Sequence, residues 1–187
     1  MKIAIYCGSN KGNNKIYEKE AKKLGKYFAK HDIGLVYGGG NIGIMGVIAD
    51  SVMKNGGHVC GVITEFLKDK EAAHKGISEL IVTKNMHKRK KLMIDLADAF
   101  VALPGGAGTM DEIFEAWTWL QIGLYKKPCG FYNINGFYDK LMEFLLHMNK
   151  EGFLNTSFID ALVLENKPKN LIKALRNAKK PLSKWGE

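Results

Sequence analysis

The sequence predicts an α/β protein with a single domain over residues 1–187, a doubly wound parallel sheet with helices on both faces. Short β-rich runs alternate with helical patterns along the whole chain, and this spacing is typical of βαβ units with right-handed crossovers. With 46% apolar and 25% charged residues the chain can bury one sizeable core, whereas a second domain would be cramped. Ligands of such sheets bind beyond the carboxyl ends of the strands, so a site is expected there.

The first half of the chain alternates regularly. The expected helix Ile16–Lys30 carries apolar residues three or four positions apart, and the glycine-rich stretch 55–57 ends the next helix. The stretch 64–77 shows no clear period and is expected to be a loop. Strands are expected at Lys2–Tyr6, Ile33–Tyr37, His58–Ile63 and Glu79–Thr83, and helices at Ile16–Lys30, Gly43–Lys54 and Met86–Ala97.

The second half continues the alternation. Strands are expected at Ala99–Leu103, Pro128–Tyr132 and Leu162–Leu164, and helices at Thr109–Ile122, Gly136–Lys150 and Asn170–Asn177. The tail 179–187 is expected to be loosely held. Because no run of 18 apolar residues exists in the sequence, no membrane span is expected. The apolar part of the N-terminus is too short for a signal peptide, so we expect a cytoplasmic protein with no membrane partner.

Cysteines, histidines and charge exclude several kinds of site. Cys7, Cys60 and Cys129 lie far apart without a CxxC pair, and the five histidines form no HxH or HExxH group. Neither a disulfide framework nor a metal site is therefore expected. The net charge of +9 would attract anions. No basic stretch is interleaved with aromatic residues, however, so no nucleic-acid partner is expected.

Two glycine-rich turns each join a predicted strand to a predicted helix. The first, residues 38–43, matches GxGxxG, and Glu65 follows 22 residues beyond it, as in a dinucleotide site. It follows the second strand rather than the first, and a tight turn with close packing explains it about as well. The second turn, Pro104 to Thr109, lacks the GK[ST] of a triphosphatase loop. It is predicted to cradle a phosphate on exposed amides, with Thr109 capping the helix.

Carboxylates behind the second turn indicate more than phosphate binding. Asp111 and Glu112 are expected in the first helical turn, and Glu115 lies one turn further on the same face. Carboxylates there stabilise a helix by about 0.3–1 kcal/mol, yet an anion site has no evident use for two of them. Glu112 is therefore a candidate for work on the non-phosphate part of a ligand. Asp111 and Glu115 fit either capping or function.

A basic helix is expected to start at the same edge of the sheet. The stretch from Lys84 to Lys91 holds five cations and one histidine in eight residues. Cations at a helix start oppose the macrodipole unless an anion joins them. Arg89 could hold a phosphate by two hydrogen bonds or pair with a carboxylate such as Glu112. The neighbouring lysines also fit a solvated face.

Together these motifs closely resemble the Lonely Guy family of cytokinin-activating phosphoribohydrolases, whose members are often mislabelled as lysine decarboxylases. Its signature PGGxGTxxE stands here as Pro104 to Glu112, and its MHxRK as Met86 to Lys90. The likeness extends over about residues 2 to 178. Plant members often carry a bulky Tyr where this chain has Ala107, so the resemblance leaves the preferred base open.

The resemblance implies a Rossmann-like, commonly dimeric protein that needs no cofactor. Its substrate would be a nucleoside 5′-monophosphate, such as AMP or a cytokinin riboside monophosphate, hydrolysed at the N-glycosidic bond to free base and ribose 5-phosphate. Arg89 and Glu112 match the catalytic pair of the family. The candidate substrate-binding residues are Ser9, Gly39, Gly40, Met86, Lys90, Gly105, Gly106, Ala107, Gly108, Thr109, Met110, Asp111 and Glu115.

The chemistry suggests a role for each part of this site. Breaking a ribosyl C–N bond develops positive charge on the ribose, which a carboxylate stabilises. Glu112 would lie beneath the ribose and position water, Arg89 would orient Glu112, and the amides of residues 106–109 would hold the 5′-phosphate. The alternative is a non-catalytic carrier of a nucleotide or of molybdenum cofactor. Lysine decarboxylation is disfavoured, because no lysine stands out as an anchor for pyridoxal phosphate.

Overall fold

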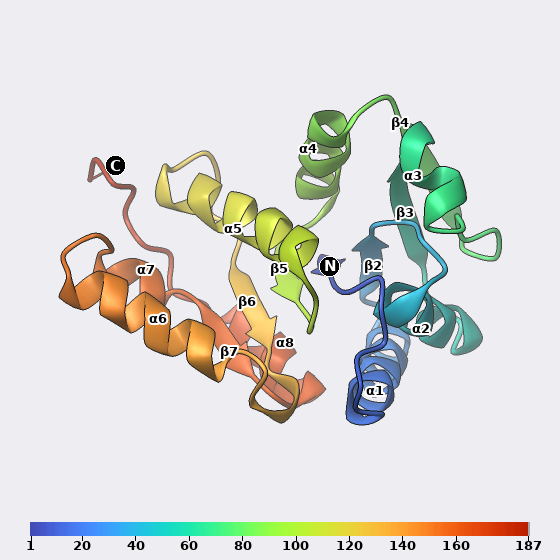
Figure 1. The fold of residues 1–187 in the computed structure, drawn as a ribbon. Coiled ribbons are helices and arrows are strands. Elements are labelled where there is room, and N and C mark those ends of the chain that lie inside the picture. Colours follow the sequence, from blue (N-terminus) through green and yellow to red (C-terminus); the bar gives the residue numbers. More distant parts are fainter. Residues whose placement is uncertain (187) are drawn as a thin grey trace.

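The computed structural model describes residues 1–186, and its strands form one seven-stranded sheet in the order β4-β3-β2-β1-β5-β6-β7 (Figure 1). Every pair of neighbouring strands is parallel. The strands are β1 Lys2–Tyr6, β2 Gly34–Tyr37, β3 Val59–Thr64, β4 Glu79–Thr83, β5 Ala99–Ala102, β6 Cys129–Tyr132 and β7 Val163–Glu165. The predicted doubly wound α/β fold is therefore confirmed.

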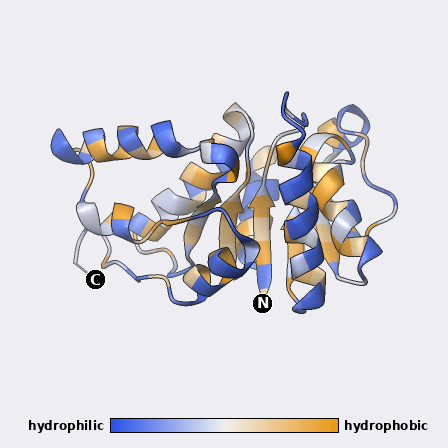
Figure 2. Cartoon of the chain, turned by 90° about the horizontal axis from the view of Figure 1, so that it is seen from below, coloured by the Kyte–Doolittle hydropathy of each residue, from blue (hydrophilic) through white to orange (hydrophobic). Residues whose placement is uncertain are grey.

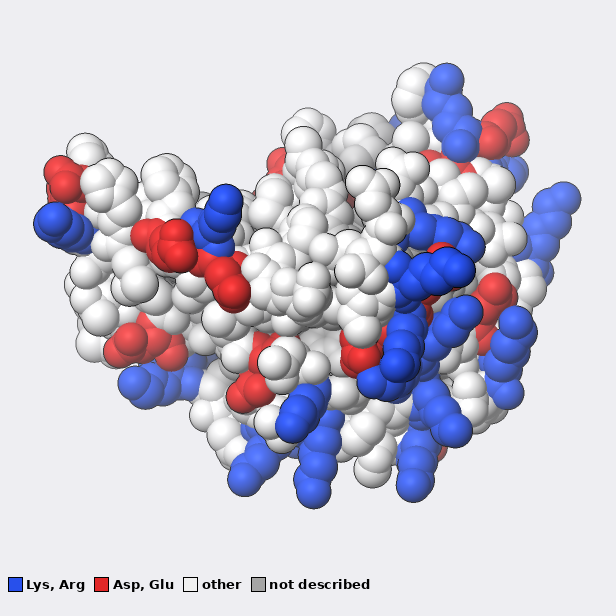
Figure 3. Space-filling model, turned by 60° about the horizontal axis from the view of Figure 1, so that its bottom comes forward, with Lys and Arg blue, Asp and Glu red and all other residues white. Residues whose placement is uncertain are grey.

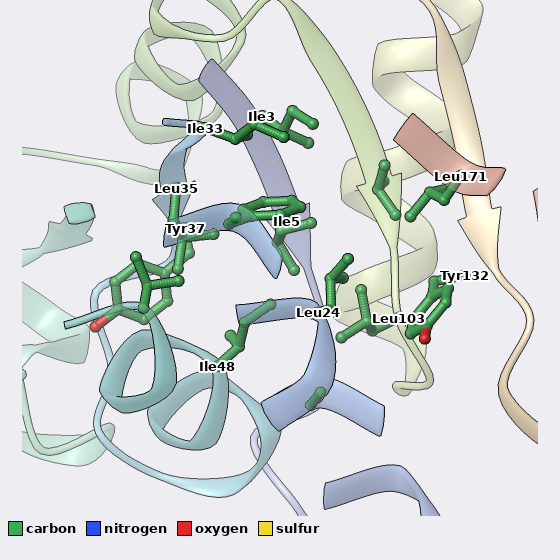
Figure 4. Packing of buried hydrophobic residues seen from close by; sticks show 14 of the residues in the cluster. Ile3, Ile5, Leu24, Ile33, Leu35, Tyr37, Ile48, Leu103, Tyr132 and Leu171 are labelled. Atoms are coloured by element: carbon green, nitrogen blue, oxygen red, sulfur yellow. The ribbon is translucent and has the colours of Figure 1, made fainter. Parts of the chain in front are cut away.

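Helices cover both faces of this sheet because the strand residues alternate between two cores. Ile3 and Ile5 of β1 face one core, whereas Ala4 and Tyr6 face the other. The first core is closed by α1 Ile16–Lys30, α2 Gly43–Lys54 and α8 Pro168–Arg176, and the second by α4 Met86–Leu96, α5 Ala107–Gln121, α6 Asp139–Lys150 and α7 Thr156–Asp160. Figure 4 shows side chains of the first core between strands and helices. Apolar residues concentrate on the central strands (Figure 2).

Two of the expected segments are wrong. The stretch 64–77 is not entirely loop, because it contains helix α3, Glu65–Lys70. Thr64 caps this helix by accepting a hydrogen bond from the Leu67 N–H at 3.2 Å. All six helical residues are exposed or half-buried, so no apolar stripe signals the helix in the sequence. The helix expected over Gly136–Lys150 begins later, at Asp139, because a 3-10 turn, η1 Ile134–Gly136, precedes α6 and Gly136 has a φ of 70°.

Part of the basic charge lies on two helices of one face. Lys and Arg side chains gather over α1 and α8 (Figure 3). The exposed basic residues there are Lys19, Lys22, Lys23, Lys26 and Lys30 on α1, and Lys169, Lys173 and Arg176 on α8. The charge of these eight residues belongs to solvated helix surfaces rather than to a cavity.

The C-terminal tail continues without regular secondary structure as far as residue 186. The Lys184 N–H donates a hydrogen bond to the Gln121 carbonyl at 2.9 Å. A loosely held tail remains a prediction, and Glu187 lies outside the described residues. Within residues 1–186, each helix is too short or too polar to cross a bilayer.

Candidate active site

A cavity of about 500 Å³ opens at the carboxyl edge of the sheet. It lies where the chain order reverses, since β1 leads to β2 on one side and β5 leads to β6 on the other. Ligands of doubly wound folds bind at this switch point, and the volume is in the range of small-molecule sites. The walls come from the β1–α1 loop, the starts of α2 and α4, α3 with the residue after it, and the 104–109 turn.

The 104–109 turn presents the open N-terminus of α5 to this cavity. The Gly8 N–H donates to the Pro104 carbonyl at 3.1 Å, which holds the β1–α1 loop to the turn. α5 begins at Ala107, with Gly106 as its N-cap in extended backbone, and no side chain of the described residues caps it. The first amides of α5 are therefore free to bind an anion.

The expectation that Thr109 caps this helix is wrong. Thr109 lies inside α5 and is only 3% exposed. Its Oγ1 packs against Gly105, where an added Cβ would come within 2.0 Å of that oxygen. Gly105 is therefore required by a close approach of side chain to backbone. Because α5 starts two residues earlier than expected, Asp111 and Glu112 occupy its second turn, not its first.

Glu112 is a nearly buried carboxylate on the cavity wall, with 13% of its side chain exposed. Burial raises its pKa from 4.5 to about 7. Arg89, whose Nη1 lies 3.9 Å from Glu112 Oε1, acts in the opposite direction on this pKa, and Glu71 and Asp111 raise it further. Burial outweighs the arginine because the guanidinium is shared with a second carboxylate.

Arg89 is fixed by the ends of two strands. It is 4% exposed, and its Nε donates to the Val62 carbonyl at 2.9 Å while Nη2 donates to the Gly38 carbonyl at 3.0 Å. An added Cβ on Gly38 would lie 2.4 Å from Nη2, so this position of the first glycine turn leaves room for the arginine. The guanidinium thus stands between Glu112 and Glu71 in one orientation.

Glu71 is the part of the site that the sequence motifs do not reveal. It follows α3 and lines the cavity, and its Oε2 lies 3.8 Å from Arg89 Nη2. That oxygen is buried without a hydrogen-bond partner among residues 1–186. Burial raises the pKa of Glu71 while Arg89 lowers it. An unpartnered carboxylate oxygen in a cavity wall can accept a hydrogen bond from a ligand hydroxyl or amine.

The remaining candidate residues separate into two groups. Those that line the cavity are Ser9, Met86, Gly105, Gly106, Ala107, Gly108, Thr109 and Asp111, whereas Gly39, Gly40, Lys90, Met110 and Glu115 do not. Lys90 Nζ lies 3.2 Å from Asp111 Oδ2 and 2.5 Å from Glu115 Oε2. Lys90 therefore links α4 to α5 behind the cavity wall. No cluster of metal-ligating side chains occurs within the described chain.

The ionisation of Glu112 predicts how stability depends on pH. A carboxyl group whose pKa rises on folding stabilises the folded state below its unfolded pKa, and this contribution is lost as pH rises through about 7. Glu112→Gln removes the effect. We expect its stability advantage over wild type to grow by about 2 kcal/mol between pH 5 and pH 8. Urea unfolding at both pH values measures this, and an advantage that does not change with pH would contradict the assigned pKa.

Comparison with known proteins identifies the family. The sequence model of the family described as "Possible lysine decarboxylase" matches residues 45–175. The cytokinin riboside 5′-monophosphate phosphoribohydrolase of Rhodococcoides fascians is 40% identical over 176 residues, which cover 94% of this chain and 89% of that protein. This chain belongs to the Lonely Guy (LOG) family. The LOG enzyme of Oryza sativa subsp. japonica is 44% identical over 153 residues, 82% of this chain and 63% of its own length.

Solved structures show that the LOG fold is shared more widely. The molybdenum cofactor binding protein from Rippkaea orientalis superposes with a TM-score of 0.69 at 21% identity, covering 94% of this chain and 95% of that one. At this identity the likeness shows the fold alone. In this LOG family member, the two motifs that carried the resemblance both line one cavity, and Arg89 Nη1 lies 3.9 Å from Glu112 Oε1 in its wall.

Proposed function

We propose that this chain hydrolyses the N-glycosidic bond of a nucleoside 5′-monophosphate, with AMP or a cytokinin riboside monophosphate as substrate. Free base and ribose 5-phosphate are the products. The observation that carries the proposal is the placement of Glu112, a nearly buried carboxylate, in the same cavity as the open N-terminus of α5. The phosphoribohydrolase names of the curated relatives at about 40% identity support it.

The phosphate is bound at the start of α5. The amides of residues 106–109 and the partial positive charge of the helix hold its oxygens, and Ser9 of the neighbouring loop lines the same space. This contact fixes the ribose in the cavity. Binding energy from the unreactive phosphate then serves to orient the anomeric carbon.

The ribosyl bond breaks beside Glu112. As the C1′–N bond lengthens, its electron pair moves to the base nitrogen and positive charge develops on the ribose. The carboxylate form of Glu112 stabilises this charge and orients a water whose oxygen bonds to C1′. The water releases one proton and the base nitrogen takes up one, so that the products are the ribose hydroxyl and the neutral base. Arg89 keeps Glu112 in place, and Glu71 accepts a hydrogen bond from the ligand.

A carrier of a nucleotide or of molybdenum cofactor is the alternative, since a molybdenum cofactor binding protein shares the fold. Two largely buried carboxylates in the cavity, Glu112 and Glu71, oppose a role limited to holding an anion. A panel of nucleoside monophosphates, assayed for free base by chromatography, tests the proposal. Release of base from at least one of them is expected; tight binding with no release from any would indicate the carrier.

We further propose that the protein works as one domain, in a homodimer, in the cytoplasm. Large apolar side chains stay exposed on and beside α6, with Phe144 at 52%, Leu146 at 57% and Phe153 at 88%, and such residues favour a partner surface. The three cysteines are free thiols, which suits a reducing compartment. Light scattering on the purified protein tests the dimer.

A further inference from the structure

One buried histidine stands out in the segment that carries Glu71. From Glu65 to Lys88, His74 is the only buried residue, at 6% exposed. The residues around it form part of the cavity wall, since both Leu67 and Glu71 line the cavity. A surface segment with so little buried side chain needs a specific anchor to keep one conformation.

The ring of His74 makes two contacts that require a single tautomer. Its Nδ1 accepts a hydrogen bond from the Gly76 N–H at 3.1 Å, so this nitrogen carries no proton. Its Nε2 lies 3.3 Å from Oδ1 of Asp50 on α2. The proton of the neutral ring is therefore on Nε2 and points to Asp50. A second proton on Nδ1 would face the Gly76 N–H, donor against donor.

The backbone of the same segment is tied to the first glycine turn. The His74 N–H donates to the Gly39 carbonyl at 2.9 Å, and the Asn41 N–H donates to the Glu71 carbonyl at 3.1 Å. Ala73 pairs with Gly40 in an isolated β-bridge. These contacts tie Gly39 and Gly40 to the segment that carries Glu71, although neither glycine lines the cavity.

The residue after Glu71 ends helix α3. Ala72 has a φ of 47°, in the left-handed region, and this is the usual conformation of the first residue beyond a helix that closes in a Schellman motif. The Ala73 N–H donates to the Lys68 carbonyl at 2.8 Å and the Ala72 N–H to the Asp69 carbonyl at 3.4 Å. The Ala72 carbonyl in turn accepts a hydrogen bond from the Asn41 N–H at 3.0 Å, so the end of α3 is itself tied to the first glycine turn.

We propose that His74 is a positioning residue of the active site. Its Nε2–H tautomer anchors the segment 71–76 to α2 through Asp50, and this anchor keeps the carboxylate of Glu71 in the cavity wall at Arg89. His74 acts through Glu71 and does not touch the ligand. The activity test of this inference rests on the proposed hydrolysis, whereas the state of the ring can be tested without it.

A set of variants separates anchoring from general stability. His74→Ala and Asp50→Ala are expected to lower kcat/KM for base release from AMP at least tenfold. Asp50→Asn keeps an oxygen that accepts from Nε2–H and should stay within about threefold of wild type. Lys75→Ala, at an exposed neighbouring position, is the matched control and should leave the rate unchanged.

A double-mutant cycle decides whether His74 acts through Glu71. Two positions that act as one unit show non-additive effects. In the Glu71→Ala background, His74→Ala should therefore change kcat/KM by less than twofold. A full tenfold loss in that background, or wild-type activity of His74→Ala itself, would overturn the proposal.

Nitrogen NMR of the imidazole rings tests the tautomer without activity. The signals that disappear in His74→Ala identify the ring, and they should show a protonated Nε2 and an unprotonated Nδ1 at pH 7.5. A proton on Nδ1 would overturn the anchor. If wild type releases no base from any nucleotide, the proposed hydrolysis fails by itself. Calorimetric binding of AMP then replaces kcat/KM in the same cycle.

Discussion

Replacing Glu112 with glutamine is expected to slow base release from AMP by about 10³-fold, the magnitude seen when one electrostatic partner of a transition state is removed. The amide keeps the volume of the side chain but has no charge to offer the ribosyl cation. The phosphate contacts at the start of α5 do not depend on this carboxylate. The Kd for AMP should therefore stay within a few-fold of wild type while kcat falls.

The loss cannot come from unfolding, because Glu112→Gln is expected to be more stable than wild type at pH 8. Glu151→Gln is the matched control: it makes the same change at a half-exposed carboxylate that pairs weakly with His147, 3.9 Å away on α6. Its activity should equal that of wild type. Base release by Glu112→Gln at more than a tenth of the wild-type rate would rule out the proposed mechanism.

The sequence was most informative where apolar periodicity was complete. The bounds expected for the strand Lys2–Tyr6 and the helices Ile16–Lys30 and Gly43–Lys54 agree with those of β1, α1 and α2. These elements bury a clear stripe or a continuous run. α3 buries none of its residues. A helix that is stabilised by a cap and by local hydrogen bonds shows no apolar periodicity in its sequence. Short helices of this kind therefore cannot be predicted from apolar periodicity.

The residues of the candidate site were predictable where they belong to a recognisable sequence motif. Arg89 and Glu112 each belong to a dense motif, so their meeting at one sheet edge followed from the alternation of strands and helices. Glu71 and His74 belong to no motif, and their function depends on a segment that folds back over the first glycine turn. The residue types of this segment do not predict that it folds back over the glycine turn. For Thr109 the sequence predicted a role that the structure does not show. Threonine is a good capping residue, but Thr109 is packed inside the helix.

Replacing Arg89 with methionine should have the largest effect on folding as well as on activity. Methionine fills similar space but leaves the Val62 and Gly38 carbonyls without their donor, and it leaves two carboxylates facing an apolar group. Breaking a buried ion pair from one side typically costs about 3–5 kcal/mol. We expect a loss of this size in urea unfolding at pH 7, together with a loss of base release.

The same change should move the pH dependence in a defined direction. Arg89 is the main group that lowers the pKa of Glu112, so without it the pKa should rise above 7. Any residual activity of Arg89→Met should then require a more alkaline pH than that of wild type. An unchanged pH profile would show that Arg89 does not act on Glu112.

Arg89→Lys separates the charge of this residue from its geometry. A lysine restores a cation and so should recover much of the stability, but a single ammonium group cannot reproduce the planar fork that meets two carbonyls and two carboxylates. Misplacement of a catalytic group by about 1 Å can cost 10²-fold in rate, and a loss of this size is expected. Arg176→Lys is the control, because Arg176 is the other arginine of the chain and is exposed on α8. This change should alter neither stability nor base release. Wild-type activity in Arg89→Lys would show that only the positive charge of Arg89 is needed and that the geometry of its guanidinium is not.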